Sequence, residues 1–131
     1  MKKRRILLIE LQNSFQRDLF QHLHQEGYEV FSVEKEKDVI ELLSNTKVDA
    51  VILGLEGLKQ EGVSVLRILR QRYPEINVIT INSAERFDLS IMCMRLGAFD
   101  DFLIPFELDA LMISLREAMG MKSDHALGKK N

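Results

Sequence analysis

The side chains that could do chemistry in this chain are acids placed just after buried apolar runs. Glu10 follows the run 6–9, and Glu56 comes shortly after the run 50–53. Carboxylates at neighbouring strand ends are suitable ligands for a divalent cation. Gly54, which ends the second run, offers neither a nucleophile nor a metal ligand. Glu10 and Glu56 therefore predict at most a weak cation site, and the alternative is two solvated acids near helix N-termini.

Three further groups have ordinary structural explanations. Ser83 has a hydroxyl that a kinase could phosphorylate, but Asn82 and Ser83 are also good residues to cap a following helix. Asp100 and Asp101 read as a loop acid followed by an exposed acid on an edge strand. Cys93 is the single cysteine, so the chain has no internal disulfide and we expect a small buried side chain.

The apolar pattern predicts the elements that position these groups. Short continuous apolar runs, typical of strands covered on both faces, alternate with longer amphipathic segments. The predicted strands are 6–9, 28–33, 49–53, 76–81 and 101–104, and the predicted helices are 13–26, 37–45, 63–72, 83–97 and 106–119. The segment 54–62 contains three glycines and is predicted to be a loop.

Strict alternation of strands and helices predicts an α/β fold. Short connections imply parallel strands joined by right-handed crossovers, which gives a single doubly wound, flavodoxin-like (βα)5 domain. The half-polar second strand suits the sheet edge and favours the strand order 2-1-3-4-5. Ligands of such sheets bind beside the carboxyl ends of strands one and three.

Length, charge and hydropathy limit the functions that the chain can have. The 131 residues fit one domain, which we expect to span 4–120 and to be followed by a short polar tail, 121–131. A net charge of -2 and a pI near 5.9 provide no basic field for binding nucleic acid. No apolar stretch approaches the roughly 20 residues of a membrane span, so we expect a cytoplasmic protein.

Four stretches, in this order and spacing, resemble the receiver domain of two-component response regulators. The most specific is 94–106, Met-Arg-Leu-Gly-Ala-Phe-Asp-Asp-Phe-Leu-Ile-Pro-Phe, and the others are 5–10, 49–62 and 74–79. The resemblance covers about residues 4–120. It implies the chemotaxis-regulator fold and a signalling module of two-component or phosphorelay type, not an enzyme.

The resemblance also implies where the family's phosphoryl chemistry would lie. Those positions are Glu10 and Leu11 for the acidic pair that binds Mg²⁺, Gly54 for the phosphoacceptor aspartate, Asn82 for the hydroxyl residue, Ile104 for the lysine and Asp101 for the aromatic switch residue. Only Glu10 keeps the expected chemistry. Phosphoryl transfer depends on positioning and on stabilisation of charge. We therefore predict a pseudo-receiver that binds no cofactor and cannot be phosphorylated.

The fourth predicted helix is more apolar than one buried stripe requires. Leu89 and Met92 lie three residues apart, on a face where receivers commonly carry polar residues. This spacing predicts an exposed patch for a protein partner or a second copy of the chain, extended by Asp101. The alternative is that these side chains pack against neighbouring helices. The resemblance implies that the fourth helix, last strand and last helix form the docking and dimer surface.

Two other functions stay open. A working phosphorelay receiver would need an atypical acceptor, a carboxylate or hydroxyl, together with a cation. A flavodoxin-like binder of small ligands would need a loop that holds phosphate, and 54–62 matches neither the dinucleotide nor the P-loop pattern. We thus expect protein partners, and neither nucleic acid nor membrane.

Overall fold

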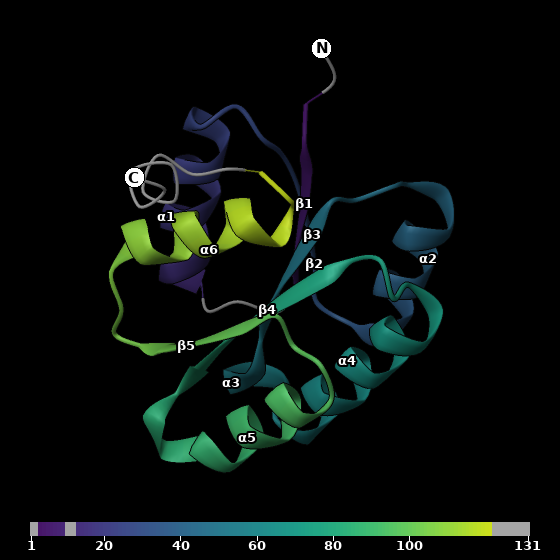
Figure 1. The fold of residues 1–131 in the computed structure, drawn as a ribbon, viewed down its shortest axis with the longest axis vertical. Coiled ribbons are helices and arrows are strands. Elements are labelled where there is room, and N and C mark those ends of the chain that lie inside the picture. Colours follow the sequence, from purple (N-terminus) through teal and green to yellow (C-terminus); the bar gives the residue numbers. More distant parts are fainter. Residues whose placement is uncertain (1–2, 10–12, 122–131) are drawn as a thin grey trace, which may run out of the picture.

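The computed structural model describes residues 3–9 and 13–121, which form a parallel sheet covered by helices on both faces (Figure 1). The strands are β1 (Arg5–Ile9), β2 (Glu29–Val33), β3 (Ala50–Gly54), β4 (Asn77–Ser83) and β5 (Asp100–Ile104). All neighbouring strands are parallel, and their order is β2-β1-β3-β4-β5. The predicted fold class and strand order are confirmed.

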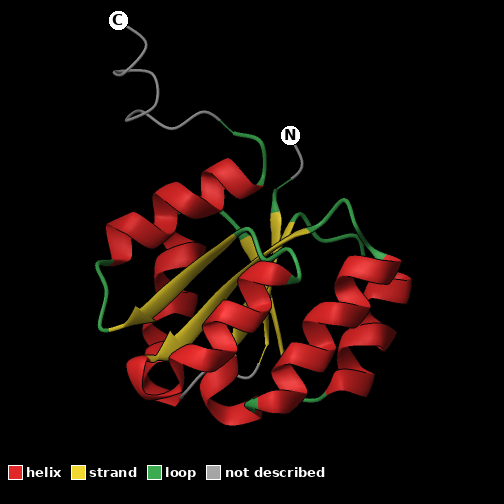
Figure 2. Cartoon of the chain, turned by 60° about the horizontal axis from the view of Figure 1, so that its bottom comes forward, coloured by secondary structure: helices red, strands yellow, loops and turns green. Residues whose placement is uncertain are grey.

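The helices divide between the two faces of the sheet (Figures 1 and 2). One face carries α1 (Asn13–Gln25) and α6 (Leu108–Ala118). The other carries α2 (Glu36–Asn45), α4 (Gln60–Arg72) and α5 (Phe87–Arg95). Two short elements complete the chain, the single turn α3 (Leu55–Leu58) and the 3-10 turn η1 (Ala84–Arg86).

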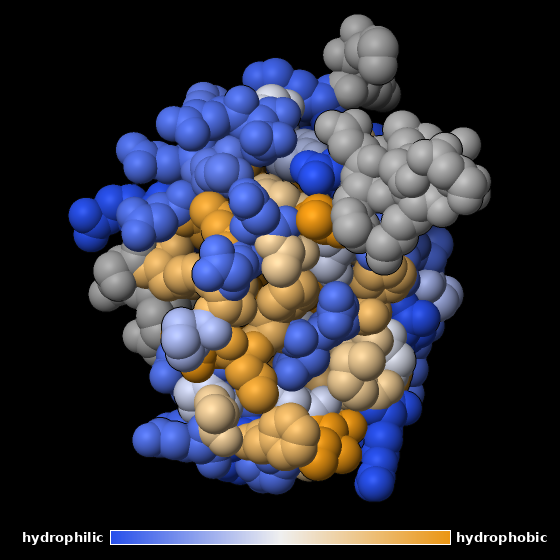
Figure 3. Space-filling view, turned by 60° about the vertical axis from the view of Figure 1, so that its left-hand side comes forward, coloured by the Kyte–Doolittle hydropathy of each residue, from blue (hydrophilic) through white to orange (hydrophobic). Residues whose placement is uncertain are grey.

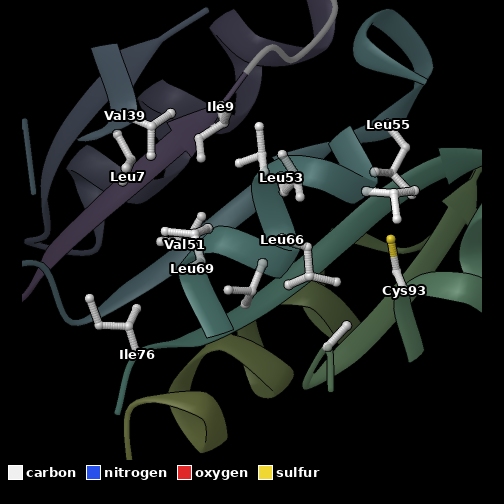
Figure 4. Close-up of a cluster of buried hydrophobic side chains, with 14 of the residues drawn as sticks. Leu7, Ile9, Val39, Val51, Leu53, Leu55, Leu66, Leu69, Ile76 and Cys93 are labelled. Atoms are coloured by element: carbon white, nitrogen blue, oxygen red, sulfur yellow. The ribbon is translucent and has the colours of Figure 1, made fainter. Parts of the chain in front are cut away.

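Strand alternation builds a separate apolar core on each face. Along β1, Leu7 and Ile9 join the core beneath α2, α4 and α5, whereas Ile6 and Leu8 join the core beneath α1 and α6. Figure 4 shows the first of these cores, with the Cys93 side chain directed into it. Full burial of each such side chain stabilises the fold by about 1.5–3 kcal/mol.

The prediction that 54–62 is a loop is wrong, because this segment is mostly helical. It forms α3 and the start of α4, separated by Lys59 at a φ of 55°. Gly62 lies inside α4, where an added Cβ would approach Leu55 Cδ2 to 2.8 Å. This glycine therefore permits close packing between two helices, which a count of glycines cannot distinguish from a turn.

The boundaries around α5 also differ from the predicted ones. β4 continues to Ser83, and α5 begins only at Phe87, after η1. The helix ends at Arg95, two residues before the predicted end. Gly97 does stop it, with a φ of 105°, and the Ala98 amide bonds to the carbonyl of Cys93. β5 begins one residue before the predicted start, and α6 begins at Leu108 instead of 106.

None of the helices in the described ranges combines the length and the hydropathy that crossing a bilayer requires.

Candidate functional site

Three of the predicted site positions meet at the carboxyl edge of the sheet. Gly54 ends β3, Asn82 is the penultimate residue of β4 and Ile104 ends β5. The register pairs Gly54 with Ile81 and Ile104 with Ser83, so the three positions lie on neighbouring strands, each one residue further toward the carboxyl edge than the last. Glu10 and Leu11 lie outside the described residues.

The side chains at this edge lack the groups that phosphoryl transfer requires. Gly54 has a φ of -86° and a ψ of 126°, a conformation open to any residue, so the backbone itself does not demand glycine. Ile104 places an apolar side chain, 36% exposed, where the family has a lysine. Glu56 is an exposed residue of α3. The described residues contain no group of three or more His, Cys, Asp or Glu side chains arranged for a metal ion.

Asn82 is fully buried and does not cap a helix, so that prediction is wrong. Its Nδ2 donates to the Arg86 carbonyl at 2.6 Å and to Ser90 Oγ at 3.0 Å, while its Oδ1 accepts from the Ser83 amide at 2.8 Å. Ser83 likewise makes no side-chain cap bond. The side chain of Asn82 instead ties the end of β4 to the beginning of α5.

Asp101 is half-buried and hydrogen-bonded, which corrects its expected role as a plain exposed acid. Its Oδ1 accepts from Thr80 Oγ1 at 2.6 Å and from Ser90 Oγ at 3.0 Å. We call Thr80, Asn82, Ser90 and Asp101 the polar network. It joins β4, α5 and β5, and every buried side-chain nitrogen or oxygen of the described residues has a partner.

Thr80 and Ser90 were not identified from the sequence. Thr80 and Asn82 lie two residues apart on β4, so both side chains point to the face that carries α5. Two polar side chains at alternate positions, within and just after the mainly apolar stretch 78–81, are the signal that would have predicted a buried hydrogen-bond network.

The neighbouring Asp100 is held on the other face of the sheet. Its Oδ2 accepts from Ser114 Oγ of α6 at 2.8 Å, and its Oδ1 accepts from the Asp101 amide at 2.8 Å. Consecutive strand residues point to opposite faces. The two adjacent aspartates therefore contact different helices.

Cys93 lies on α5 beside the polar network and is fully buried. Burial, and secondarily the negative charge of Asp101, raises the pKa of the Cys93 thiol to about 11. The thiol is therefore protonated at neutral pH and is not activated as a nucleophile.

The predicted partner surface is corrected at two of its three residues. Leu89 is fully buried, and Met92 packs against the same apolar core. The large apolar residues that α5 exposes are Phe87 (53%), Ile91 (40%) and Met94 (45%). Their spacing places them on one stripe of the helix, opposite the stripe that contains Leu89. We call these three residues the apolar face of α5.

Asp101, the third predicted residue, does reach this surface. A shallow pocket of about 340 Å³ is lined by Phe87, Ser90, Ile91, Met94, Arg95 and Asp101. Figure 3 shows the side of the molecule formed by β5, with α6 above it and α5 below, and apolar surface extends down its middle to the lower edge. Part of the polar network thus borders the apolar face of α5.

Comparison with known proteins agrees with this geometry. Residues 6–116 match the family model described as the response regulator receiver domain. An NtrX-like response regulator of Rickettsia typhi is 30% identical over 115 residues, which cover 86% of this chain but 24% of the relative. The sporulation initiation phosphotransferase F of Bacillus subtilis is 22% identical over 124 residues, 95% of this chain and 100% of that protein.

A solved structure shows the same fold. The CheY-like receiver domain from Methanospirillum hungatei JF-1 superposes with a TM-score of 0.81 at 18% identity, covering 91% of this chain and 95% of that one. The chain spans about a quarter of the length of the NtrX-like relative. The strand order, the positions at the carboxyl edge and the extent of the family match lead to one conclusion: this chain belongs to the response regulator receiver domains.

Proposed function

We propose that this receiver domain is a pseudo-receiver, which cannot be phosphorylated at the usual position and signals by binding a protein. One observation carries the proposal: the carboxyl edge presents Gly54, a fully hydrogen-bonded Asn82 and the apolar Ile104. These three positions would have to supply the nucleophile, the hydroxyl and the cation of a phosphorylated receiver.

The loss of charge at the edge argues against phosphoryl transfer as strongly as the loss of the nucleophile. The transferred group carries negative charge, which metal ions and cationic side chains stabilise. Ile104 provides no positive charge, and Leu11 replaces one of the two acids that the family uses to bind Mg²⁺. An atypical acceptor such as Glu56 or Ser83 would lack the same stabilisation.

The apolar face of α5 supports the binding half of the proposal. Isolated exposed apolar residues are common, but three large ones on one helical stripe mark a surface for association. We infer that a protein partner or a second copy of the chain covers this face. The family resemblance implies that α5, β5 and α6 form the docking surface, and the apolar face of α5 is part of it. Phe87, Ile91 and Met94 replace the predicted Leu89 and Met92.

The test is exposure to phosphoryl donors. The protein is incubated with acetyl phosphate and Mg²⁺, or with beryllofluoride and Mg²⁺, and its intact mass and amide spectrum are recorded. We expect neither to change. Addition of a phosphoryl group, or shifts confined to Gly54, Asn82 and Ile104, would favour the working phosphorelay receiver with an atypical acceptor.

Variants at these positions test whether the missing groups at the carboxyl edge are the reason that the protein is not phosphorylated. Gly54→Asp alone should remain unmodified, because the metal ligand and the cation are still absent. The triple variant Leu11→Asp, Gly54→Asp and Ile104→Lys restores all three groups and should accept a phosphoryl group. The small-ligand alternative stays a prediction that no feature of the described residues favours.

A further inference from the structure

The attachment of α5 to the sheet has an apolar part and a polar part. Leu89 and Cys93 are fully buried against the core beneath α5. Contacts of this kind stabilise the helix but have no directionality. Hydrogen bonds do, because they weaken steeply when donor and acceptor lose alignment.

The polar network contacts α5 at two points, one turn apart. Asn82 bonds to the carbonyl of Arg86, just before the helix, and to the hydroxyl of Ser90 in its first turn. Ser90 in turn donates to Asp101 on β5. Anchors from two different strands fix both where α5 begins and how it is rotated about its axis.

A rotation or shift of α5 would separate these groups, and only the half-buried Asp101 is within reach of water. Thr80, Asn82 and Ser90 are all buried. Each buried donor or acceptor that loses its partner would lower the population of the shifted arrangement by about tenfold. The shared acceptor Asp101 couples the losses, because a displaced Ser90 leaves both Asn82 and Asp101 short of a partner.

We propose that the polar network is a fixed latch, which holds α5 in one arrangement on the sheet and so presents the apolar face of α5 constantly. The reading of that face as a docking surface rests on the proposed function, whereas the single arrangement of α5 does not. The family resemblance assigns Asn82 to the hydroxyl residue and Asp101 to the switch residue, and in this chain both are joined through Ser90.

Ser90→Ala is the direct test, and Ser114→Ala is its matched control. Each change removes one buried serine hydroxyl that donates to an aspartate of β5, at 3.0 Å for Ser90 and 2.8 Å for Ser114. Hydrogen exchange is followed in peptides from α5 and α6. Ser90→Ala should speed exchange in 87–95 by at least about tenfold relative to α6, because the variant loses both hydrogen bonds of the Ser90 hydroxyl. Ser114→Ala should not single out α5.

Equal protection of α5 in Ser90→Ala and in Ser114→Ala would overturn the latch. A measurement on the unaltered chain covers the case in which Ser90→Ala does not fold. Relaxation dispersion of the α5 amides should show no exchange on the microsecond to millisecond timescale, and a second populated arrangement of α5 would overturn the proposal. Neither measurement uses a phosphoryl donor, so the latch and the pseudo-receiver proposal can fail separately.

Discussion

Asp100 and Asp101 are adjacent on β5, yet the two faces of the sheet use them differently. Asp100 receives one side-chain hydrogen bond, from Ser114. On its face the next side chain along the strand is Phe102, whose ring lies 5.2 Å from the ring of Phe106. Phe106 also makes an edge-to-face contact with Phe15 at 5.4 Å. The α6 face is therefore held by apolar packing and by separate polar contacts, because Asn77 of β4 also donates to the Ala118 carbonyl at 2.8 Å without joining the Asp100 contact.

Asp101 belongs to a connected set of polar side chains on the α5 face. Two hydroxyls from different elements share its Oδ1, and Ser90 continues the chain to Asn82. The same pairing of serine with aspartate is a local anchor on one face and part of a three-element junction on the other. Displacement of α5 would therefore break several linked hydrogen bonds at once, whereas the bond between Asp100 and Ser114 can break alone.

The largest expected effect is the difference between Asp101→Ala and Asp100→Ala. The first change removes the acceptor of two buried hydroxyls and should lower the free energy of unfolding by about 3 kcal/mol. The second should cost about 1 kcal/mol, because Ser114 can turn to the Ala110 carbonyl one turn back. Ser90 would have to compete for the equivalent carbonyl, because Asn82 Nδ2 already donates to the Arg86 carbonyl at 2.6 Å. Urea unfolding measures both, and equal losses would contradict the comparison.

The next effect is a loss of stability at high pH that depends on Cys93. The folded thiol has a pKa of about 11, raised above its ordinary value of 9.0 by burial and then by Asp101. The unfolded thiol therefore ionises first, so its contribution to stability is complete below about pH 9 and decreases between about pH 9 and pH 11. The loss should reach about 2 kcal/mol at pH 11.

Cys93→Ala is the control for that prediction. It lowers stability at every pH, but its own pH profile should lack the component that comes from the thiol. The two unfolding free energies should therefore converge as the pH rises from 8 to 11. Parallel profiles across that range would show that the thiol ionises equally easily in the folded protein.

The sequence predicted the sheet because alternation of buried runs and amphipathic segments leaves few topologies open. It failed where a contact joins distant residues. Asn82 is a good helix cap by local preference, and its actual partners, Arg86 and Ser90, depend on where α5 begins. The pairing of Asp101 with Thr80 depends on the register of β4 and β5, which no local pattern specifies.

The misplaced partner surface has a similar physical origin. α5 carries two apolar stripes, one containing Leu89 and Cys93 and the other containing Phe87, Ile91 and Met94. Periodicity identifies both stripes but does not determine which one faces the sheet. The folded chain buries the stripe with Leu89 and Cys93 in the core and at the same time brings Ser90 to Asp101 on β5, a contact that depends on the position of another strand.

A smaller effect is expected from charges placed on the apolar face of α5. Ile91→Glu combined with Met94→Glu should weaken self-association or partner binding by at least about tenfold. The free energy of unfolding should change by no more than about 1 kcal/mol, because both residues lie on the surface, at 40% and 45% exposure. Glu117→Gln, on the exposed side of α6, serves as the control surface change.

Sedimentation and pull-down experiments measure this effect. The comparison of the two faces requires that the α6 variant behaves as the unaltered chain does. Association that survives the double α5 variant, or that is lost equally in the α6 variant, would remove α5 as the docking helix.

The smallest expected effect shows whether the charges of Asp100 and Asp101, on opposite faces of the sheet, influence the pKa of Cys93 differently. The charge of Asp101 is the second cause of the raised pKa of Cys93, after burial. Asp101→Asn keeps an oxygen that Thr80 and Ser90 can bond to, so the polar network should persist while the charge is lost. The pKa of the thiol should then decrease by a fraction of a unit, because burial, the larger cause, is unchanged.

Asp100→Asn should leave that pKa where it is, since Asp100 points to the opposite face of the sheet. The chemical shift of the Cys93 Cβ carbon, followed against pH, measures both variants. A decrease of similar size in the two variants would mean that the thiol responds to the total charge of β5. A decrease in Asp101→Asn alone would mean that Cys93 responds to the contacts on its own face, the same contacts that orient α5.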